Sequence, residues 1–512
     1  MSSRMITTWS ALVGVLSAVA ALAAAEAVAL ITGPASSPLL AVGSWVIDIV
    51  PPLVKDAAIA LFGTADKIAL LVCLGILVLI LAALVGVLEY RRPPFGKLLL
   101  LAVIGIALLA VLTRAEATWE WAVPTLAALL AGGLTLHRMT RRLHSWQSAE
   151  EREVVSVDRR GFLAMAAAVA GASAVVGIGA RMVNAGTSAV TAVRQAVTLP
   201  RPTTAAAAVP AGASLNIDGI SPLISGNDGF YRIDTALQVP SVDASAWRLR
   251  ITGMVEQEIE IGFDELLALP LIETYVTLMC VSNEVGGSLV GNAKWLGYPI
   301  RELLARARPL AGADMVLSTS VDGWTAGTPL SILQEESRDS ILAVGMNGEP
   351  LPLEHGFPVR MVVPGLYGYV SATKWVVELK LTRFADETAY WTDRGWSAKG
   401  PVKTSSRIDV PRAGARLDAG TVAVAGVAWA QHTGIEGVEV RVDGGEWERA
   451  TLAEAISPDT WVQWVYEWDA TSGNHTIEAR ALDAAGGTQS GRQRPVVPDG
   501  AEGYHELSVT VA

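Results

Sequence analysis

Long apolar runs fill the first third of the chain, and short alternating runs fill the rest. Five of the apolar runs approach the length that a helix needs to cross a hydrocarbon core of about 30 Å, and they cover residues 9–31, 67–88, 97–112, 119–136 and 162–182. Residues 39–62 are apolar as well, but two prolines, Asp48 and Lys55 interrupt them. We therefore expect an interfacial or re-entrant segment there, with a sixth crossing as the alternative, within an α-helical transmembrane bundle over residues 1–184.

Arginines flank these runs and predict how the bundle is inserted. They are Arg4, Arg91, Arg92, Arg138, Arg141 and Arg142. Cytoplasmic loops are enriched in Lys and Arg, and five crossings place all of these arginines on one side. We therefore expect a cytoplasmic N-terminus, a bundle that serves mainly as an anchor, and an extracytoplasmic location for everything after about residue 182.

The pattern of a folded domain begins after an Ala-, Thr- and Pro-rich stretch over residues 185–222, which predicts a loosely extended linker. Alternating residues from Thr274 to Cys280 predict a strand that ends at Cys280. A Gly- and Asn-containing loop should follow, and then a helix over residues 300–307. On position alone, Cys280 is either a small buried hydrophobe or a ligand for something held at the strand end.

Further along, residues 316–320 predict another strand, with a turn at 322–324. From residue 396 the runs become short, alternating and rich in turns. Val438, Val440 and Val442 share one face, and Asp443-Gly444-Gly445 predicts a hairpin turn. Residues 396–512 therefore predict an immunoglobulin-like β-sandwich, in which five tryptophans serve core and cross-strand packing: Trp429, Trp447, Trp461, Trp464 and Trp468.

Composition removes several classes of function. The formal net charge of −11 gives no reason to expect a nucleic-acid partner. With Cys73 and Cys280 as its two cysteines, the chain cannot hold a disulfide framework, a four-cysteine iron–sulfur cluster or a CxxCH haem site. His137 and His144 lie at or beyond a predicted helix end, which disfavours a bis-histidine haem inside the bundle.

Three sequence blocks carry a family resemblance. They are CVSNEVGGSLVGNAKWLGYPI from Cys280, DGWTAGTPLS over 322–331 and GEPLPLEHGFPVRMVVPGLYGYVSATKW over 348–375. In this order and spacing they resemble the molybdenum domain of the sulfite oxidase family, and the resemblance covers residues 223–395. It implies an α+β domain that binds molybdenum through a single pyranopterin, molybdopterin, with Cys280 as the protein thiolate on the metal. Thiolates suit such a soft site.

The same resemblance assigns further residues to the cofactor. Tyr231 and Arg232, in GFYRIDTAL, match a segment that lies against the pterin or the substrate side of the metal; without the resemblance they would be a core or rim aromatic and a surface cation. Ser320 matches a hydroxyl near the pterin. The phosphate contacts match His355, Arg360, Ala372, Thr373 and Lys374, and turns that bring three potential cations together suit a phosphate. Tyr367 and Tyr369 are expected to line the substrate pocket.

The resemblance implies oxygen-atom transfer on sulfite or a related small sulfur compound, with electrons passed to a separate cytochrome, flavoprotein or quinone. One position departs from the family: Glu284 stands where sulfite oxidases usually carry an Arg, and it should weaken oxyanion binding by roughly 1–4 kcal/mol, depending on exposure. An S-oxide reductase, acting on methionine sulfoxide, is therefore an alternative. A second is a non-catalytic binding module displayed at the surface, which predicts disruption at Cys280, His355 or Arg360.

Two further expectations concern delivery and assembly. Asp158-Arg159-Arg160-Gly161-Phe162-Leu163 resembles the twin-arginine export motif, which suits a domain that must cross the membrane folded around its cofactor. The sandwich resembles the second domain of sulfite oxidases, which often dimerises, so a homodimer through residues 396–512 is the expected assembly.

Overall fold

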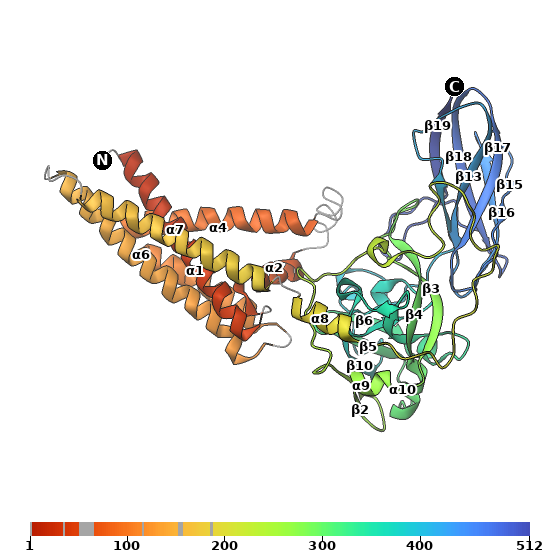
Figure 1. Ribbon diagram of the computed structural model, residues 1–512, viewed down its shortest axis with the longest axis horizontal. Helices are drawn as coiled ribbons and strands as arrows, with labels where there is room; N and C mark the ends of the chain where they lie inside the picture. Colours follow the sequence, from red (N-terminus) through yellow and green to blue (C-terminus); the bar gives the residue numbers. More distant parts are fainter. Residues whose placement is uncertain (1–2, 34–35, 51–65, 115–116, 152–156, 185–187) are drawn as a thin grey trace. The chain divides into compact units, whose positions relative to one another are not determined.

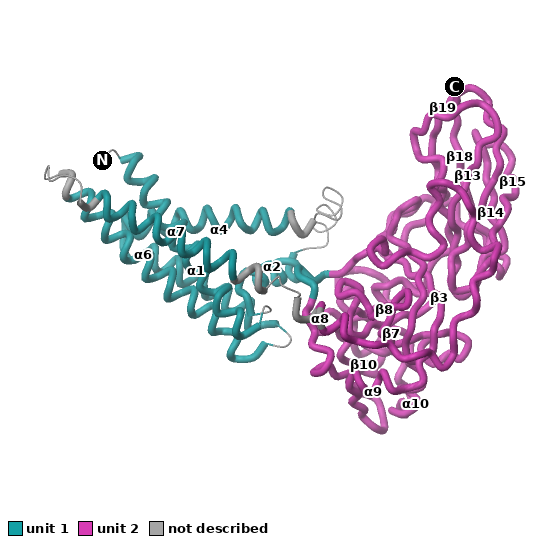
Figure 2. Tube along the Cα trace, in the orientation of Figure 1, with its two compact units in different colours: residues 1–189, 235–239 teal, residues 190–234, 240–512 magenta. Residues whose placement is uncertain are grey.

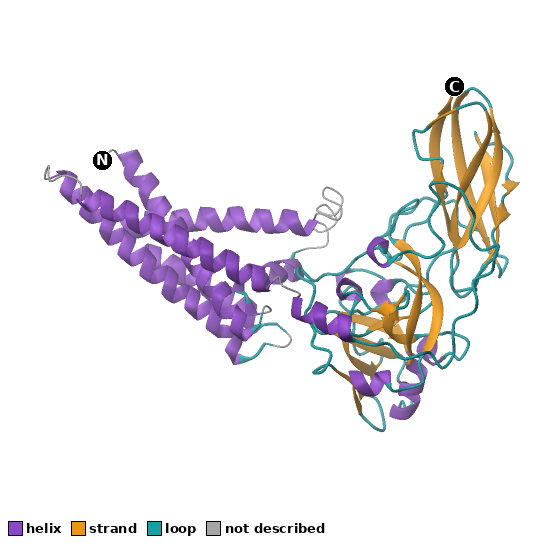
Figure 3. Ribbon diagram, in the orientation of Figure 1, coloured by secondary structure: helices purple, strands orange, loops and turns teal. Residues whose placement is uncertain are grey.

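The computed structural model describes residues 3–33, 36–50, 66–114, 117–151, 157–184 and 188–512 (Figure 1). The chain divides into two compact units, which are Met1–Ala189 with Thr235–Val239, and Val190–Asp234 with Pro240–Ala512 (Figure 2). The first unit is helical and the second is built mainly from strands and loops (Figure 3).

Long apolar helices make up the first unit. They are α1 (Ser3–Thr32), α2 (Pro38–Ile49), α4 (Asp66–Arg91), α5 (Phe95–Leu112), α6 (Ala122–Glu151) and α7 (Val157–Asn184), with a short η3 (Trp119–Trp121) before α6. Helices α1 and α4 cross where Gly14 faces Gly86, since a Cβ on either glycine would overlap the backbone opposite. Small residues of this kind allow close helix approach without a side-chain core.

Four described helices are long and apolar enough to span a membrane: Ser3–Thr32, Ala69–Arg91, Phe95–Leu112 and Arg159–Gly179. The remaining predicted crossing, at residues 119–136, lies in η3 and the first half of α6, which is not among these four helices; the second half of α6 carries Arg138, Arg141 and Arg142. Residues 39–49 of the predicted interfacial segment lie within α2, a shorter apolar helix, whereas Pro51, Pro52 and Lys55 lie outside the described residues.

Contacts within the bundle bring the basic helix ends together. Arg91, at the end of α4, donates from Nη2 to Thr7 Oγ1 in α1 at 2.7 Å. Trp9 of α1 packs edge-on against Phe162 of α7, with ring centroids 5.7 Å apart. Tyr90 stacks on His144 of α6 with centroids 4.2 Å apart. The arginines that sequence patterning assigns to one side of a membrane therefore lie at one end of the bundle.

Two sheets form the first part of the second unit. One has the order β2-β1-β10-β5-β6 and contains β1 (Arg248–Gly253), β2 (Ile259–Gly262), β5 (Met315–Ser320), β6 (Thr325–Pro329) and β10 (Val376–Thr382). The other has the order β3-β4-β7-β8, with β9 beside β7, and contains β3 (Ile272–Met279), β4 (Val290–Pro299), β7 (Ile341–Met346), β8 (Glu349–Pro350) and β9 (Arg360–Val362).

Short helices and turns complete this α+β domain. They are α8 (Ser188–Ala196), α9 (Phe263–Leu267), α10 (Ile300–Ala307), α11 (Leu330–Gln334), η4 (Asn227–Gly229), η5 (Leu353–His355), η6 (Gly368–Val370) and η7 (Thr392–Arg394). The core lies between the sheets and helices, with Trp295, Phe357 and Leu249 among its fully buried side chains.

Several predicted elements are found, and two are corrected. The strand before Cys280 is β3, and α10 spans the predicted helix. The predicted loop is shorter than expected, because residues from Val290 onward form β4, with Met279 opposite Val290 in a hairpin; the apolar side chains of β4 are buried and favour pairing over a loop. The stretch predicted as a loosely extended linker, residues 185–222, contains α8, and its Thr204 bridges to Ile272.

The β-sandwich follows as two sheets. One has the order β11-β13-β17-β16, and the other has the order β12-β19-β18-β14-β15. Their strands are β11 (Ser405–Val410), β12 (Arg416–Leu417), β13 (Gly420–Trp429), β14 (Ile435–Val442), β15 (Glu448–Arg449), β16 (Thr451–Leu452), β17 (Val462–Ala470), β18 (Gly473–Asp483) and β19 (His505–Val511).

Details of the sandwich match the sequence pattern. Asp443 and Gly444 have φ values of 53° and 68° in a tight turn that begins the connection from β14 to β15, where Gly445 N–H donates to the Val442 carbonyl at 2.9 Å. Trp429, Trp461, Trp464 and Trp468 are buried as predicted. Trp447 is instead half-buried at the surface, where the guanidinium carbons of Arg441 and Arg480 lie 4.5 and 4.3 Å from its ring centroid.

Candidate active site

Cys280 stands at the end of β3, at the start of a tight loop over residues 281–289. Its N–H donates to the Leu289 carbonyl at 3.0 Å, and its carbonyl accepts from Asn283 N–H at 3.1 Å. The buried Asn283 side chain accepts from Leu289 N–H at 2.6 Å and closes the loop. The thiol is buried, and burial raises its pKa, which hydrogen bonds from Ser282 and the charge of Lys374 oppose.

Basic side chains gather beside this loop from three parts of the chain. His355 ends η5, Arg360 begins β9, and Lys374 precedes β10, while Arg232 follows η4. Asp234 Oδ2 lies 2.9 Å from Arg232 Nε and 3.0 Å from Lys374 Nζ. Two cations therefore share one carboxylate oxygen, and Arg360 adds a further positive charge that the short turns hold close to them.

Backbone contacts fix these cations in place. Lys374 Nζ donates to the Glu354 carbonyl at 2.9 Å, and Arg360 Nη1 donates to the His355 carbonyl at 3.1 Å. Gly356, with φ of 112°, lies so close to the Arg360 and Lys374 side chains that a Cβ there would contact both at 2.9 and 3.2 Å. A larger residue would strain this turn and separate the two cations.

Burial works against the charges of this cluster. Desolvation, together with the charge of Arg360, lowers the pKa of His355 to about 4 and that of Lys374 to about 8. Desolvation alone lowers the pKa of Arg360 to about 10. A bound anion would reverse these shifts, because an opposite charge favours the protonated forms.

Tyr231 connects the two ends of the site. Burial raises the pKa of its hydroxyl above its usual range, and the charges of Cys280 and Arg360 both act on it. Its ring stacks on Phe230, with centroids 5.1 Å apart, and Phe230 in turn packs edge-on against His355 at 5.5 Å. The structure thus places Tyr231 and Arg232 beside the cation cluster.

Two buried polar atoms at the predicted positions have no hydrogen-bond partner among the described residues. They are His355 Nδ1 and Ser320 Oγ. Leaving a buried polar atom unpaired costs about 1–3 kcal/mol, so both suit a polar ligand. Together with the excess of positive charge and the nearby thiol, they fit a group that carries a phosphate, polar ring atoms and a thiophilic metal.

The remaining predicted residues are engaged elsewhere. Tyr369 donates its hydroxyl to the Ser397 carbonyl at 2.7 Å. The Tyr367 hydroxyl lies 3.5 Å from Lys403 N, and burial raises its pKa to about 12, with the charge of Cys280 among the smaller causes. The buried Thr373 hydroxyl bonds Ser318 Oγ at 2.7 Å, and Ala372 N–H donates to the Gly368 carbonyl at 2.9 Å.

Sequence reasoning missed several residues that complete the site. Asp234 could have been predicted from the sequence, because it is an acidic residue two positions after Arg232 in the same motif, GFYRIDTAL. Asn283 and Asn227, whose carbonyl lies 3.1 Å from His355 Nε2, carried none. Arg407 and His505 reach the Cys280 loop from the sandwich, more than a hundred residues away in the sequence.

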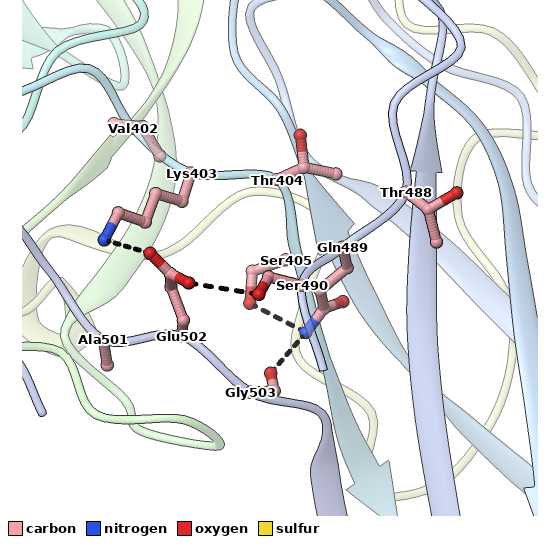
Figure 4. A pocket seen from close by; sticks show the side chains of 10 residues that line it. All are labelled: Val402, Lys403, Thr404, Ser405, Thr488, Gln489, Ser490, Ala501, Glu502 and Gly503. Atoms are coloured by element: carbon pink, nitrogen blue, oxygen red, sulfur yellow. Dashed lines mark hydrogen bonds and ion pairs between the residues drawn. The ribbon is translucent and has the colours of Figure 1, made fainter. Parts of the chain in front are cut away.

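A hollow of about 340 Å³ lies elsewhere, in the β-sandwich (Figure 4). Several of its polar groups pair with one another: Lys403 Nζ lies 3.0 Å from Glu502 Oε1, and Gln489 Nε2 donates to the Gly503 carbonyl at 2.8 Å. Its lining includes none of the predicted site residues, and its polar groups do not point to a ligand.

Comparison with known proteins matches this picture. Residues 236–391 match the family described as oxidoreductase molybdopterin binding domain, and residues 405–479 match the bacterial Ig domain. Mitochondrial sulfite oxidase of Mus musculus is 30% identical over 258 residues, which are 42% of this chain and 47% of that protein. Oxidoreductase YuiH of Bacillus subtilis (strain 168) is 32% identical over 166 residues, 32% of this chain and 80% of that protein.

Among solved structures, the sulfane dehydrogenase SoxCD of Paracoccus pantotrophus superposes with a TM-score of 0.51 at 23% identity, covering 57% of this chain and 82% of that one. At this identity the likeness concerns the fold. The chain spans about half the length of the mammalian sulfite oxidases that it matches.

The family match and the relatives define a molybdopterin-dependent oxidoreductase. The chain belongs to the sulfite oxidase family of these enzymes. Its N-terminal helices are compatible with a membrane anchor, and its cofactor is the molybdenum–molybdopterin of that family.

Proposed function

We propose that this chain is a membrane-anchored molybdenum enzyme that transfers an oxygen atom to or from a small sulfur compound, with Cys280 as the metal ligand. The observation that carries the proposal is the buried thiol of Cys280, which lies beside a cluster of cations. In that cluster the Asp234 carboxylate bridges Arg232 and Lys374. Such a pairing of a soft metal ligand with an anion site matches the two ends of a molybdenum pterin phosphate.

Different residues would bind different parts of the cofactor. Cys280 would hold the metal, and His355, Arg360 and Lys374 would hold the phosphate, with Ala372 and Thr373 beside them. Ser320 and His355 Nδ1 would meet polar atoms of the pterin, and Tyr231 and Arg232 would lie along it. When bound, the cofactor supplies the two-electron oxygen-transfer chemistry, and the protein supplies binding and orientation.

This chain's own residues shape the substrate side. The Tyr231 hydroxyl stays protonated at neutral pH, because burial raises its pKa, and it can donate a hydrogen bond next to Cys280. Arg232 is about two-fifths exposed and attracts anions to the site. Tyr367 and Tyr369, proposed from the resemblance as pocket residues, would need to exchange their present contacts with Lys403 N and the Ser397 carbonyl to reach a substrate.

Sulfite or a related small sulfur compound is the proposed substrate, from the sulfite oxidases among the relatives. Glu284 favours a second candidate, an S-oxide reductase acting on a neutral substrate such as methionine sulfoxide. Glu284 is exposed, however, so solvent screens its charge and reduces the penalty for an anion. The intact set of Cys280, His355 and Arg360 argues against a displayed module without a cofactor.

Location and partners complete the proposal. The N-terminal bundle anchors the protein with its basic end in the cytoplasm, and the catalytic domain and sandwich lie outside the membrane. Arg159 and Arg160 direct export of the folded domain. Electrons pass to or from a separate cytochrome, flavoprotein or quinone, and the sandwich forms a homodimer. The gathering of the arginine ends in the bundle supports this orientation.

Metal and pterin analysis tests the proposal. Full-length protein from a host that makes the cofactor should contain close to one molybdenum atom per chain and should release close to one pterin per chain. It should then oxidise sulfite with an artificial electron acceptor, or reduce methionine sulfoxide with an artificial donor. Protein without either metal or pterin would refute the enzyme assignment for this chain, and metal-loaded protein active only on methionine sulfoxide would select the second candidate.

A further inference from the structure

The strand that leads to Cys280 is an edge strand of its sheet, and the β-sandwich covers that edge at Thr277. β3 pairs with β4 on one side, and such a strand presents unpaired N–H and C=O groups on the other. At Thr277 the N–H donates to the Asp459 carbonyl at 2.9 Å, and the carbonyl accepts from Gln431 Nε2 at 3.1 Å. Thr277 Oγ1 also accepts from Trp461 N–H at 2.8 Å.

The loop after Cys280 is held by the same domain through Arg407. This buried side chain, from β11, donates from Nη1 to the Gly287 carbonyl at 2.8 Å. Its Nε lies 2.7 Å from Asp409 Oδ1, and its Nη2 donates to Ser221 Oγ at 2.7 Å. All three nitrogens of the guanidinium therefore have a partner, which leaves the group little freedom to move away from the loop.

His505, the first residue of β19, forms the second contact with the loop. Gly286 has a φ of 75°, and a Cβ built on it would collide with the His505 imidazole. The ring is fixed in turn, because its Nδ1 accepts from Ile408 N–H at 2.9 Å, which leaves the proton on Nε2, the nitrogen nearest Gly286. The loop conformation thus depends on a ring from the sandwich.

We infer that the sandwich sets the geometry of the molybdenum thiolate, with Arg407 and His505 as positioning residues. Both sides of Cys280 are involved, since Thr277 is bonded before it and Gly286 and Gly287 are contacted after it. Outer contacts of this kind orient a metal ligand and tune the metal, and a site of this type tolerates displacements of only about 0.5 Å. The inference rests on the proposed role of Cys280, and it gives the sandwich a task besides dimerisation.

Two measurements on the full-length holoprotein test the inference without relying on turnover. In Arg407→Ala, peptide-resolved hydrogen exchange over residues 281–289 should rise at least about tenfold, since a charge-assisted hydrogen bond to the loop is lost. The paramagnetic molybdenum signal should change in the same sample. Arg441→Ala is the matched control, because Arg441 pairs with Glu478 within the sandwich, and it should leave both readouts at the native values.

Further variants cover the case in which Arg407→Ala does not fold. Arg407→Lys retains the charge but not the three contacts, and it should give a smaller change in the same direction. His505→Ala should accelerate hydrogen exchange of the loop. Gly286→Ala should also accelerate it, because the added methyl group would collide with the His505 ring. Removing that ring relieves the collision, so the double variant should exchange more slowly than the sum of the two single effects predicts.

The outcomes separate the inference from the proposed function. Metal-loaded Arg407→Lys and His505→Ala proteins with native loop exchange and a native molybdenum signal would overturn the inference while leaving the molybdenum enzyme intact. Native protein without molybdenum would refute the proposed function, and the hydrogen exchange of the loop would still report whether the sandwich holds it.

Discussion

At its Cys280 end the site is a loop whose backbone is held by hydrogen bonds, whereas at its His355 end several buried cations lie close together and repel one another. The Cys280 loop is closed by the Asn283 side chain and by contacts from the sandwich. The basic cluster has Asp234 as a shared partner, and burial lowers the pKa values of Lys374 and Arg360. The first end is shaped before a ligand arrives, and the second gains stability from the ligand itself.

This difference predicts different responses to mutation. A metal ligand in a fixed loop has no substitute, so its loss should be close to complete. A cluster of several cations shares the binding of one phosphate, so its losses should be graded and sensitive to pH.

The largest effect is expected for Cys280→Ser. Losing an outer partner of a metal ligand already costs about 10- to 100-fold in affinity or activity, so losing the ligand should lower turnover per bound molybdenum by more than about a hundredfold. Assays with an artificial electron acceptor, normalised to metal content, measure this loss. Cys73→Ser, in the helical unit, is the matched control and should keep native turnover; a Cys280→Ser enzyme with native turnover would contradict the assignment.

Arg360→Ala should lower the amount of pterin that survives purification by about 10- to 100-fold, since a buried guanidinium can hold a phosphate through two charge-assisted hydrogen bonds. Arg360→Lys keeps the charge without the forked geometry and should retain an intermediate amount. Released pterin per protein is the readout. Full pterin content in Arg360→Ala would show that the phosphate is held elsewhere.

The pH dependence of cofactor uptake should follow Lys374. Its pKa of about 8 in the cofactor-free protein means that it is charged below pH 8 and neutral above it. A phosphate monoester is already close to dianionic at pH 7, so its affinity should fall as pH rises from 7 to 9, by up to about tenfold per unit above pH 8. Uptake by cofactor-free protein measures this trend, and Lys374→Met should flatten it. The same slope in Lys374→Met would mean that another group titrates.

The smallest effect is expected for Glu284→Gln. The side chain is exposed, and exposed charge pairs are worth about 0.2–1 kcal/mol, so the KM for sulfite should fall by about two- to fivefold with little change in kcat. Glu302→Gln, on α10, where the carboxylate pairs with Arg301, controls for net charge. A decrease of tenfold or more would mean that the carboxylate turns toward the substrate when the cofactor is bound.

Local patterns predicted the strand that ends at Cys280, α10, the hairpin at Asp443 and the sandwich, because each depends on neighbours in the sequence. β4 was missed because Val290 to Pro299 follows glycines and an asparagine, and its pairing with β3 depends on a hairpin loop closed by Asn283. The number of membrane crossings stays a prediction: four described helices are long and apolar enough to span a membrane, and α6, which covers most of the fifth predicted run, continues into a basic segment.

The site itself was reached through resemblance more than through pattern. His355, Arg360 and Lys374 lie in one sequence block, so turns could be expected to bring them together. Contacts made by Arg407 and His505 had no sequence signal, because they join strands of one domain to a loop of another. Long-range packing of that kind becomes visible only in the folded chain.

X-ray absorption at the molybdenum edge of the purified holoprotein tests the central claim most directly. If Cys280 is the metal ligand, the native spectrum should contain a sulfur shell that loses one sulfur in Cys280→Ser and stays unchanged in Cys73→Ser. An identical sulfur shell in native and Cys280→Ser proteins that both hold molybdenum would contradict the account.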